Sequence, residues 1–453
     1  MPSLKKFALL VPLLLLSCYL LAQEPQPAST NQAFDDDNQI MVLPTPLLAA
    51  TPSLAFEPEL DESNFLNGGL AIGSSFDDNV LSSTSDRASD FAYSVAPYIG
   101  LSQSRSRLNW SLNYMAGFLA NQRYSALNQG SHDLYLQGLY RIAPHANLRL
   151  FDSFRKSTGF FDQASQPADF STSGILDRPN ASIVTPLSRQ TANTSTAEID
   201  DQFSASSMIG ASGSFHFSHF GNTPGGYQLI DSESTGGQAF YEFRVSARNM
   251  VGLTYRFQRF SFSPITDGAV AHSIFLMYTV RVKPALALSF FAGPEQSNTY
   301  AGVFTGSTPA GGTVSQRNWS SSGGGTFNWS GRRNSVIAEF IREITDGGGL
   351  LGVVRANIAD VGVRRQLTHS LGASVWMAYA TNDSLISDST LQPRLNTASA
   401  SMTFDRSLGN HVDLKFGYMR NYQQRFAGPV LADVNHNRAW VSVQYDFSRP
   451  LGR

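Results

Sequence analysis

The sequence has almost no cysteine: its single one, Cys18, lies within the first 22 residues. Those residues have the three parts of a secretory signal, namely Lys5 and Lys6 near the start, an apolar run over residues 7–16 and the small residue Ala22. We therefore expect residues 1–22 to be a cleaved signal peptide. The mature chain would then have no thiol for a disulfide or a thiolate metal site.

A different fate for Cys18 stays open. Residues 15–18 read Leu-Leu-Ser-Cys, which resembles a bacterial lipoprotein cleavage box and would leave Cys18 as a lipidated N-terminus. Against this, residues 19–21 continue the apolar run past the cysteine. Retention of the segment as a membrane helix is disfavoured, because the run is shorter than the roughly 20 apolar residues that a span requires.

The rest of the chain also lacks long apolar runs and lacks charge. No apolar stretch of about 18 residues follows residue 22, which excludes helical membrane spans. Charged residues make up 15% of the chain and the net charge is −2, so nucleic acid is not an expected partner. What the sequence has instead is Gly, Ser and Asn, with 31 Phe and 16 Tyr. This composition favours strands over a soluble helical enzyme.

Residues 23–63 are rich in proline, which breaks helices, and contain the acidic run Asp35 to Asp37. They predict a tether with little structure of its own, located in the periplasm. A short tail over residues 449–453 ends the chain.

From about residue 64 apolar and polar residues alternate within segments of ten to fourteen residues. In residues 108–114, for example, Leu, Trp, Leu and Tyr alternate with Asn, Ser and Asn, and residues 412–418 repeat the pattern. A period of two indicates a strand with two unlike faces. Soluble strands run about five or six residues, whereas a tilted strand that crosses a bilayer takes about nine to eleven. These segments therefore predict membrane-spanning strands.

The connectors between the segments alternate in length. Short links recur, for example at residues 143–145, 247–249 and 366–369. Longer loops lie between them, near residues 76–89, 121–130, 297–315, 381–391 and 423–435, and the longest covers about residues 158–197. Short periplasmic turns and long extracellular loops produce this alternation in outer-membrane barrels, so residues 158–197 are expected to be extracellular.

Seventeen strands are obvious between residues 65 and 447, yet single-chain bacterial barrels have even counts. The stretch from residue 197 to 220 has room for two strands, about 197–207 and 210–220. We therefore predict an all-β fold, a transmembrane antiparallel up-and-down β-barrel of about 18 strands over residues 64–448. Sixteen strands remain possible if the weak strands beside the long loop are extracellular.

No catalytic centre is recognisable, and the protein is not expected to be an enzyme. His272-Ser273 and His369-Ser370 are neighbours along strands, so their side chains point to opposite faces and cannot act as base and nucleophile. The turn Asp77-Asp78-Asn79 could ligate calcium, but a solvated turn is the favoured interpretation. We predict no cofactor and no metal.

Charged residues on the polar faces are the candidates for the lumen. Of the 33 basic residues 28 are Arg, which suits carboxylate or phosphate recognition. Acidic residues occur on the same faces, so a wall of ion pairs across neighbouring strands is favoured over an anion filter. The candidates are Arg149, Arg155, Glu242, Arg244, Arg256, Arg281, Glu339, Asp413 and Lys415.

The last strand, residues 440–447, has Val441, Val443, Tyr445 and Phe447 on one face. It resembles the C-terminal signal of outer-membrane proteins, which ends in an aromatic residue that the barrel-assembly machinery reads. The resemblance gives Val443, Tyr445 and Phe447 this role, although here residues 448–453 follow the aromatic.

Residues 65–160 carry a second resemblance. The segments Gly69 to Ile72, Phe76 to Val80 with its Asp-Asp-Asn turn, Val95 to Tyr98 and Arg107 to Tyr114 are similar to the N-terminal part of β-barrel porins associated with exopolysaccharide and capsule gene sets. This resemblance implies a bacterial outer-membrane porin.

Two functions are consistent with these expectations. The first is a porin-like channel for small solutes or a conduit linked to exopolysaccharide export, because eighteen strands enclose a lumen too wide for side chains to fill. The second is a structural or adhesive surface barrel with a plugged lumen. Expected partners are outer-membrane lipid and lipopolysaccharide, the barrel-assembly machinery, and polysaccharide or small solutes.

Overall fold

The computed structural model describes residues 63–81, 87–157, 182–183, 189–221, 229–265, 267–305, 308–385, 394–426 and 434–451. The expected signal peptide with Cys18, residues 23–62 of the expected tether and most of the loop 158–197 lie outside these ranges. In the part of the chain that the structure describes, no helix is long and apolar enough to cross a membrane.

The described residues form eighteen strands and one 3₁₀ helix, η3 (Ser125–Leu127). The strands are β1 (Ser63–Asp77), β2 (Asp90–Ser104), β3 (Leu108–Asn121), β4 (Gln129–Ala143), β5 (Ala146–Ser157), β6 (Gln190–Ser204), β7 (Ser207–Phe220), β8 (Asp231–Ser246), β9 (Asn249–Ser263), β10 (Gly268–Lys283), β11 (Leu286–Thr305), β12 (Thr308–Ser330), β13 (Asn334–Gly347), β14 (Leu351–Gln366), β15 (Leu371–Ser384), β16 (Arg394–Ser407), β17 (Val412–Phe426) and β18 (Val434–Pro450).

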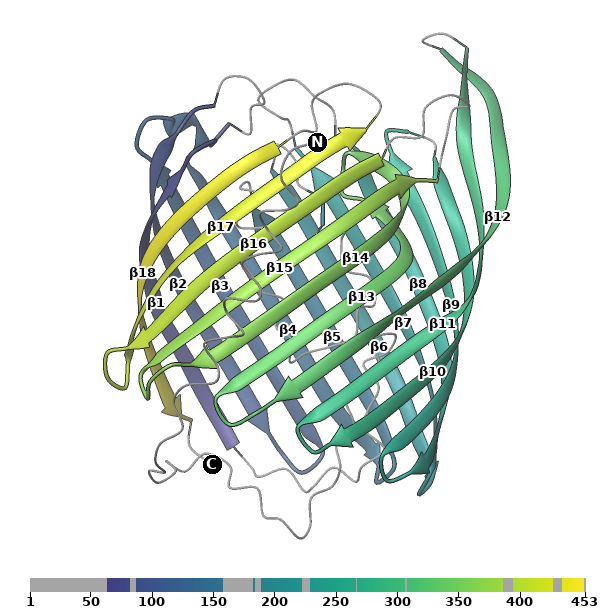
Figure 1. Ribbon diagram of the computed structural model, residues 1–453, viewed down its shortest axis with the longest axis horizontal. Coiled ribbons are helices and arrows are strands. Elements are labelled where there is room, and N and C mark those ends of the chain that lie inside the picture. The colour runs from purple at the N-terminus through teal and green to yellow at the C-terminus, as the bar shows by residue number, and fades with distance from the viewer. Residues whose placement is uncertain are drawn as a thin grey trace. The chain divides into compact units, whose positions relative to one another are not determined.

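Each strand pairs antiparallel with its neighbour in sequence, and β1 pairs with β18, so the sheet closes into a barrel (Figure 1). The closing ladder runs from Phe65 opposite Pro450 to Asp77 opposite Arg438. Closure gives the backbone of both terminal strands a partner on each side, which removes the edges that an open sheet would leave. The predicted antiparallel barrel of eighteen strands is confirmed.

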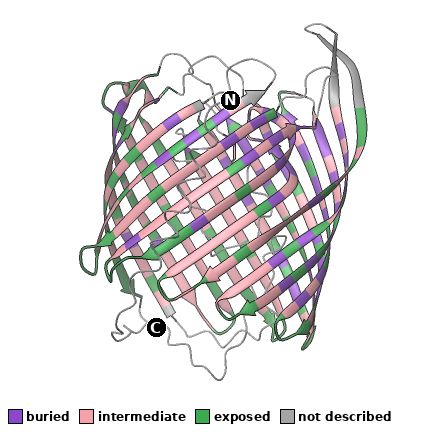
Figure 2. Ribbon diagram, in the orientation of Figure 1, coloured by how far each residue is buried: buried purple, intermediate pink, exposed green. Residues whose placement is uncertain are grey.

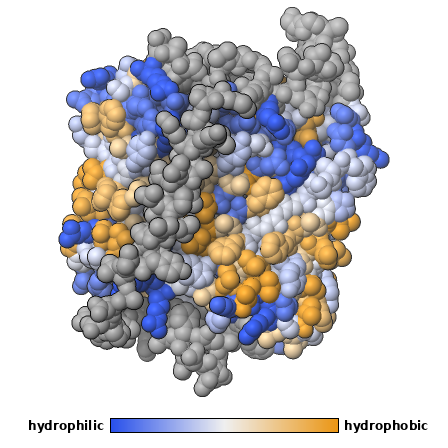
Figure 3. Space-filling model, viewed as in Figure 1, coloured by the Kyte–Doolittle hydropathy of each residue, from blue (hydrophilic) through white to orange (hydrophobic). Residues whose placement is uncertain are grey.

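The two faces of the barrel wall differ in the way that the alternation predicts. The outward face exposes large apolar side chains on strand after strand, such as Leu276 of β10, Phe340 of β13 and Val443 of β18. In Figure 3 apolar surface forms a band around the middle of the visible face, with hydrophilic surface above and below it. Inward positions are mostly Ser, Thr, Gly, Asn and charged residues. Such a distribution places apolar atoms against a nonaqueous medium and polar atoms against water.

Several predicted boundaries are wrong. Strand β18 runs to Pro450, so residues 449 and 450 of the predicted tail belong to the last strand. Strand β6 begins at Gln190, so residues 190–197 are strand and not loop, and the strand predicted at 197–207 is shifted. Its outward positions Asn193 and Ser195 bond to Asp152 of β5, which makes both faces of this part of β6 polar and hides the alternation.

Residues 297–315 were expected to be a loop, but most of them belong to the long hairpin of β11 and β12, which pairs as far as Thr305 opposite Thr308. Ladder hydrogen bonds join backbone groups, so a stretch rich in Gly, Ser and Thr can continue a strand without an apolar face. The predicted loop was therefore wrong, because a composition rich in Gly, Ser and Thr does not by itself end the pairing of two strands.

The tips of β13 and β14 fold toward the interior, as the bend at the upper right of Figure 1 shows. The ladder between β12 and β13 stops at Gly323 opposite Arg342, whereas β13 continues to pair with β14 as far as Gly347. Beyond the point of separation Ile344 and Val353 pack on inward residues of β9 and β10. The hairpin tip therefore forms a second layer inside one part of the wall.

The turn of this hairpin depends on glycine. Gly348 and Gly349 have φ angles of 57° and 83°, a region that other residues adopt only with strain. A Cβ atom on Gly349 would also lie 2.7 Å from the ring of Phe220 at the end of β7. The turn can therefore approach the opposite strands closely.

Candidate functional site

The lumen wall has a buried part and an accessible part. Inward side chains of β8, β9 and β10 are almost all buried, among them Phe240, Thr254 and Phe275. Inward side chains of β15 and β16, such as Ser374, Ser401 and Thr403, stay partly exposed. Figure 2 shows the same contrast, with buried residues concentrated on the strands at the right. The accessible wall, formed by β15–β18 and β1–β5, is therefore the surface that a solute would meet.

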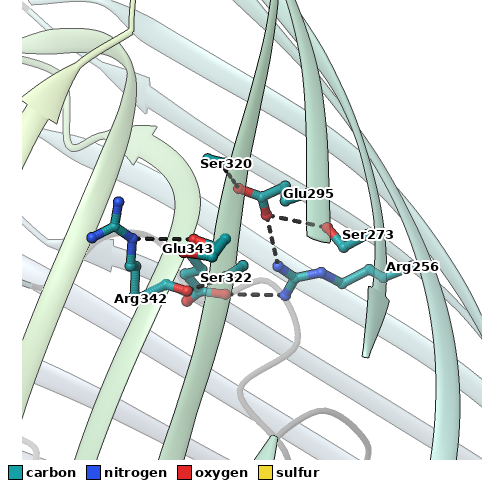
Figure 4. Close-up of polar contacts among 8 residues, drawn as sticks. Arg256, Ser273, Glu295, Ser320, Ser322, Arg342 and Glu343 are labelled. Carbon is teal, nitrogen blue, oxygen red and sulfur yellow. Dashed lines mark hydrogen bonds and ion pairs between the residues drawn. The ribbon is translucent and has the colours of Figure 1, made fainter. Parts of the chain in front are cut away.

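The buried part of the wall contains an ion-pair cluster around Arg256 of β9 (Figure 4). Its Nη1 lies 3.0 Å from Oε2 of Glu343 on β13, and its Nη2 lies 3.9 Å from Oε2 of Glu295 on β11. Ser273 and Ser320 donate hydrogen bonds to Glu295 at 3.1 and 3.4 Å. Because Arg256 is only 3% exposed and Glu295 only 1%, the cluster joins the hairpin tip to the wall and does not face the open lumen.

A second group of ion pairs lies at the border of the accessible wall, where Arg149 is partly exposed but Glu198 and Asp200 are buried. Nη1 of Arg149 on β5 lies 2.6 Å from Asp200 and 3.3 Å from Glu198, both on β6. Arg155, further along β5, lies 2.8 Å from Asp133 of β4, and both side chains keep about a third of their surface exposed. Each arginine thus has an acidic partner on a neighbouring strand, so the positive charge that it presents to the lumen is offset.

The remaining predicted lumen residues are spread around the barrel. Lys415 donates a hydrogen bond of 2.8 Å to Gln444, and Arg281 donates to the carbonyl of Pro284 in the short turn between β10 and β11. The strand alternation places four others on the inward face without bringing them into one site; these are Glu242 and Arg244 on β8, Glu339 on β13 and Asp413 on β17.

At the end of the barrel with the longer connectors, one described segment crosses the mouth. Ile183, from the connection between β5 and β6, packs with Leu351 and Val354 of β14 and with Leu395 of β16. Beside it, Asn382 of β15 donates a hydrogen bond of 3.1 Å to the hydroxyl of Ser182. Strand β15 lies nine strands round the ring from β6, on the opposite side of the barrel. Residues 182–183 therefore lie across the mouth from the strands that carry them.

The Asp-Asp-Asn turn meets β18 at the closing seam. Asp77, Asp78 and His436 bring together potential metal-ligating atoms within 4.8 Å. Their oxygens already accept protein hydrogen bonds, however: Asp77 contacts His436 and the Asn79 amide, and Asp78 accepts two bonds from Asn437. The geometry is that of a side-chain clasp between β1 and β18.

The predicted assembly residues Val443, Tyr445 and Phe447 lie on the outward face of β18 and are all more than a third exposed. They stand opposite Ile72, Leu70 and Gly68 of β1 in the closing ladder. Their role in assembly stays a prediction.

Sequence reasoning missed the acidic partners Asp133, Glu198, Asp200, Glu295 and Glu343. Glu198 and Asp200 fall in the region taken as weak strand, and Glu343 belongs to a hairpin tip whose inward fold has no local sequence signal. Two oppositely charged residues in different strands become a pair only when the register is known. The sequence alone does not give the strand register, so these ion pairs could not be predicted from it.

No known family's sequence profile matches the chain, and no curated protein matches it. Among solved structures it is similar to Pseudomonas aeruginosa OccK2 (OpdF), with 12% identity, coverage of 86% of this chain and 98% of that one, and a TM-score of 0.44. The BenF-like porin from Pseudomonas fluorescens Pf-5 is 10% identical, with coverage of 86% of this chain and 99% of that one and a TM-score of 0.44. The siderophore receptor PiuA from Acinetobacter baumannii is 9% identical, with coverage of 85% of this chain and 82% of that one and a TM-score of 0.46.

Proposed function

We propose that the chain is a channel of the bacterial outer membrane that passes small polar solutes. The observation that carries the proposal is the closed barrel with a wall that is apolar outside and polar inside. A closed barrel is the strand arrangement that satisfies every backbone group within hydrocarbon. Eighteen strands enclose more space than inward side chains fill, which leaves room for water and solutes.

The chemistry of the accessible wall favours solutes that are polar and carry little charge. Arg149 and Arg155 are paired with acidic residues, and Arg256 is buried. Between these groups the wall offers hydroxyls, for example Ser399, Ser401 and Thr403 of β16. Hydroxyl-rich walls hydrogen-bond sugars and similar solutes without selecting an ionic charge.

Two other functions are open to test. A conduit for exopolysaccharide would use the same hydroxyl-rich wall, and a polymer would have to pass residues 182–183, which lie across the mouth. A structural barrel with a closed lumen is favoured by those same contacts at the mouth. The solute channel and the polysaccharide conduit both predict conductance, and the structural barrel does not.

Recording from the purified protein in planar bilayers separates them. We expect stable conductance steps, and a larger step from the variant I183D, because an unpaired carboxylate in the cluster of Leu351, Val354 and Leu395 would expel this segment from the mouth. The matched control is I142D, which changes an exposed outward residue near the periplasmic turn. Absence of steps from folded wild-type protein together with steps from I183D would support the plugged barrel. Absence from both would end the channel proposal.

A further inference from the structure

The outer face of the wall has a gap beside β12. Above Gly323 and Arg342 strand β13 leaves β12 and bends inward, so the described upper part of β12 pairs with β11 alone. At the base of the gap, Arg342 Nε donates to the carbonyl of Ser321 and Ser322 Oγ donates to the carbonyl of Arg342. An edge of this kind exposes unpaired backbone groups, which are costly in hydrocarbon unless something covers them.

Two arginines flank this edge. Arg317 lies on β12 and bonds Asn298 of β11 through Nε at 3.2 Å, and Arg342 lies on β13. Among the described residues, neither guanidinium has a carboxylate within 4.0 Å. Figure 4 shows Arg342 on the far side of Glu343 from Arg256, apart from the buried cluster.

The nearby charges do not neutralise these arginines. Glu295 is engaged by Arg256 and two serines, and Asp383 makes two contacts with Arg394. Arg355 of β14 lies near Arg342 and also near Glu295 and Asp383. Arg317 and Arg342 therefore form a positively charged patch at the edge of β12 on the outer wall.

Apolar groups lie beside and below the two arginines. Trp319, between Arg317 and Ser321 on the same face of β12, is 69% exposed. Phe340, two residues below Arg342 on the outward face of β13, is also exposed. Exposed tryptophan is typical of a membrane–water interface. Trp319 thus lies between the two guanidinium groups along β12, and Phe340 lies below Arg342. Guanidinium groups beside exposed apolar side chains match an amphiphile that has both anionic groups and acyl chains.

We infer that Arg317, Trp319 and Arg342 form a binding site for the phosphorylated glycolipid of the outer leaflet, the lipid A part of lipopolysaccharide. Guanidinium groups bind phosphate through paired, charge-assisted hydrogen bonds. Four residues of strand separate Arg317 from Ser321, about 13 Å along β12, so one disaccharide with a phosphate at each end could reach both arginines. The inference rests on the outer-membrane location proposed above, and not on transport.

The test compares lipid A retention by folded protein. Wild type and the double variant R317Q/R342Q are refolded in detergent with bisphosphorylated lipid A or its dephosphorylated form, and bound lipid is counted by native mass spectrometry. The control R332Q removes an exposed arginine from the periplasmic turn between the same two strands. We expect the double variant to retain at least about tenfold less bisphosphorylated lipid A, because two charge-assisted contacts are lost. R332Q should match wild type.

Equal retention by wild type and double variant, or equal retention of the two lipid forms by wild type, would overturn the inference. Displacement of lipid A by millimolar inorganic phosphate would also overturn it, since the site would then take free phosphate. Heat-modifiable migration checks that each variant is folded. Bilayer conductance measured on the same samples reports separately on the channel, because loss of lipid binding should leave it unchanged.

Discussion

Replacing Arg256 with methionine should destabilise the barrel more than any single change at an exposed ion pair. The substitution keeps an aliphatic side chain over Phe275, whose ring centre lies 5.3 Å from the guanidinium carbon, but removes the positive charge. Glu343 and the almost fully buried Glu295 would lose their contacts with Arg256. Breaking a buried pair by removing one partner costs on the order of 3–5 kcal/mol, because a charge is left uncompensated.

Arg155→Met is the matched control. Its partner Asp133 lies at 2.8 Å, closer than either carboxylate approaches Arg256, yet the two side chains are 31% and 28% exposed. Exposed pairs contribute about 0–1 kcal/mol, since water screens and replaces them. The burial of the ion pair, and not its length, therefore decides which variant should lose more free energy of unfolding.

Reversible unfolding in urea, after refolding into lipid or detergent and followed by tryptophan fluorescence, measures both free energies of unfolding. A triple variant R256M/E295Q/E343Q removes the three charges together and should recover part of the loss, because the two carboxylates that faced Arg256 are then neutral as well. A loss below about 1 kcal/mol for Arg256→Met, or the same loss for Arg155→Met, would refute the assignment of a buried cluster that holds the hairpin tip.

Three further predictions concern the membrane, assembly and topology. Leu276→Arg, at an outward position that is 68% exposed, should cost about 2–4 kcal/mol in a bilayer, whereas Ser401→Arg on the inward face should cost much less; equal losses in the unfolding assay would argue against a lipid-facing exterior. Phe447→Ala should reduce the amount of heat-modifiable barrel in cells, and an unchanged amount would remove the assembly role. Protease added to intact cells should cut within residues 158–189 and spare residues 23–62, and the reverse pattern would invert the topology.

The features that the sequence predicted well are those with a local repeat. Alternation along each strand, the parity of strand number and the sequence of connectors were enough for the count of eighteen. Strand β6 was misplaced because its Asn193 and Ser195 face outward with Asp152, so no period of two in apolarity was present to read. The upper part of the hairpin of β11 and β12 was predicted as a loop because Gly and Ser occur in both loops and strand ladders.

The candidate site was less predictable, since its pairs depend on register and on bending. Arg149 was visible as a lumen residue, but Glu198 and Asp200 became its partners only through the β5–β6 register. Arg256 was expected on an open wall, and the structure buries it because the tip of β13 and β14 folds onto β9 and β10. That fold depends on apolar contacts between strands far apart in the ring, which leave no trace in any one segment.

The ladder between β1 and β18 has a consequence for the rate of folding. It joins Phe65 to Pro450, so nearly the whole described chain forms one loop that closes only when its last strand is in place. Contacts between residues so distant in sequence form late, because the entropy of closing the loop is lost before their hydrogen bonds are gained. An intermediate in which strands β1 through β17 have formed a continuous sheet still has two open edges. The clasp of Asp77 and Asp78 on β18 can form only at the final step. Weakening that clasp should slow the end of folding and leave earlier steps at their usual speed.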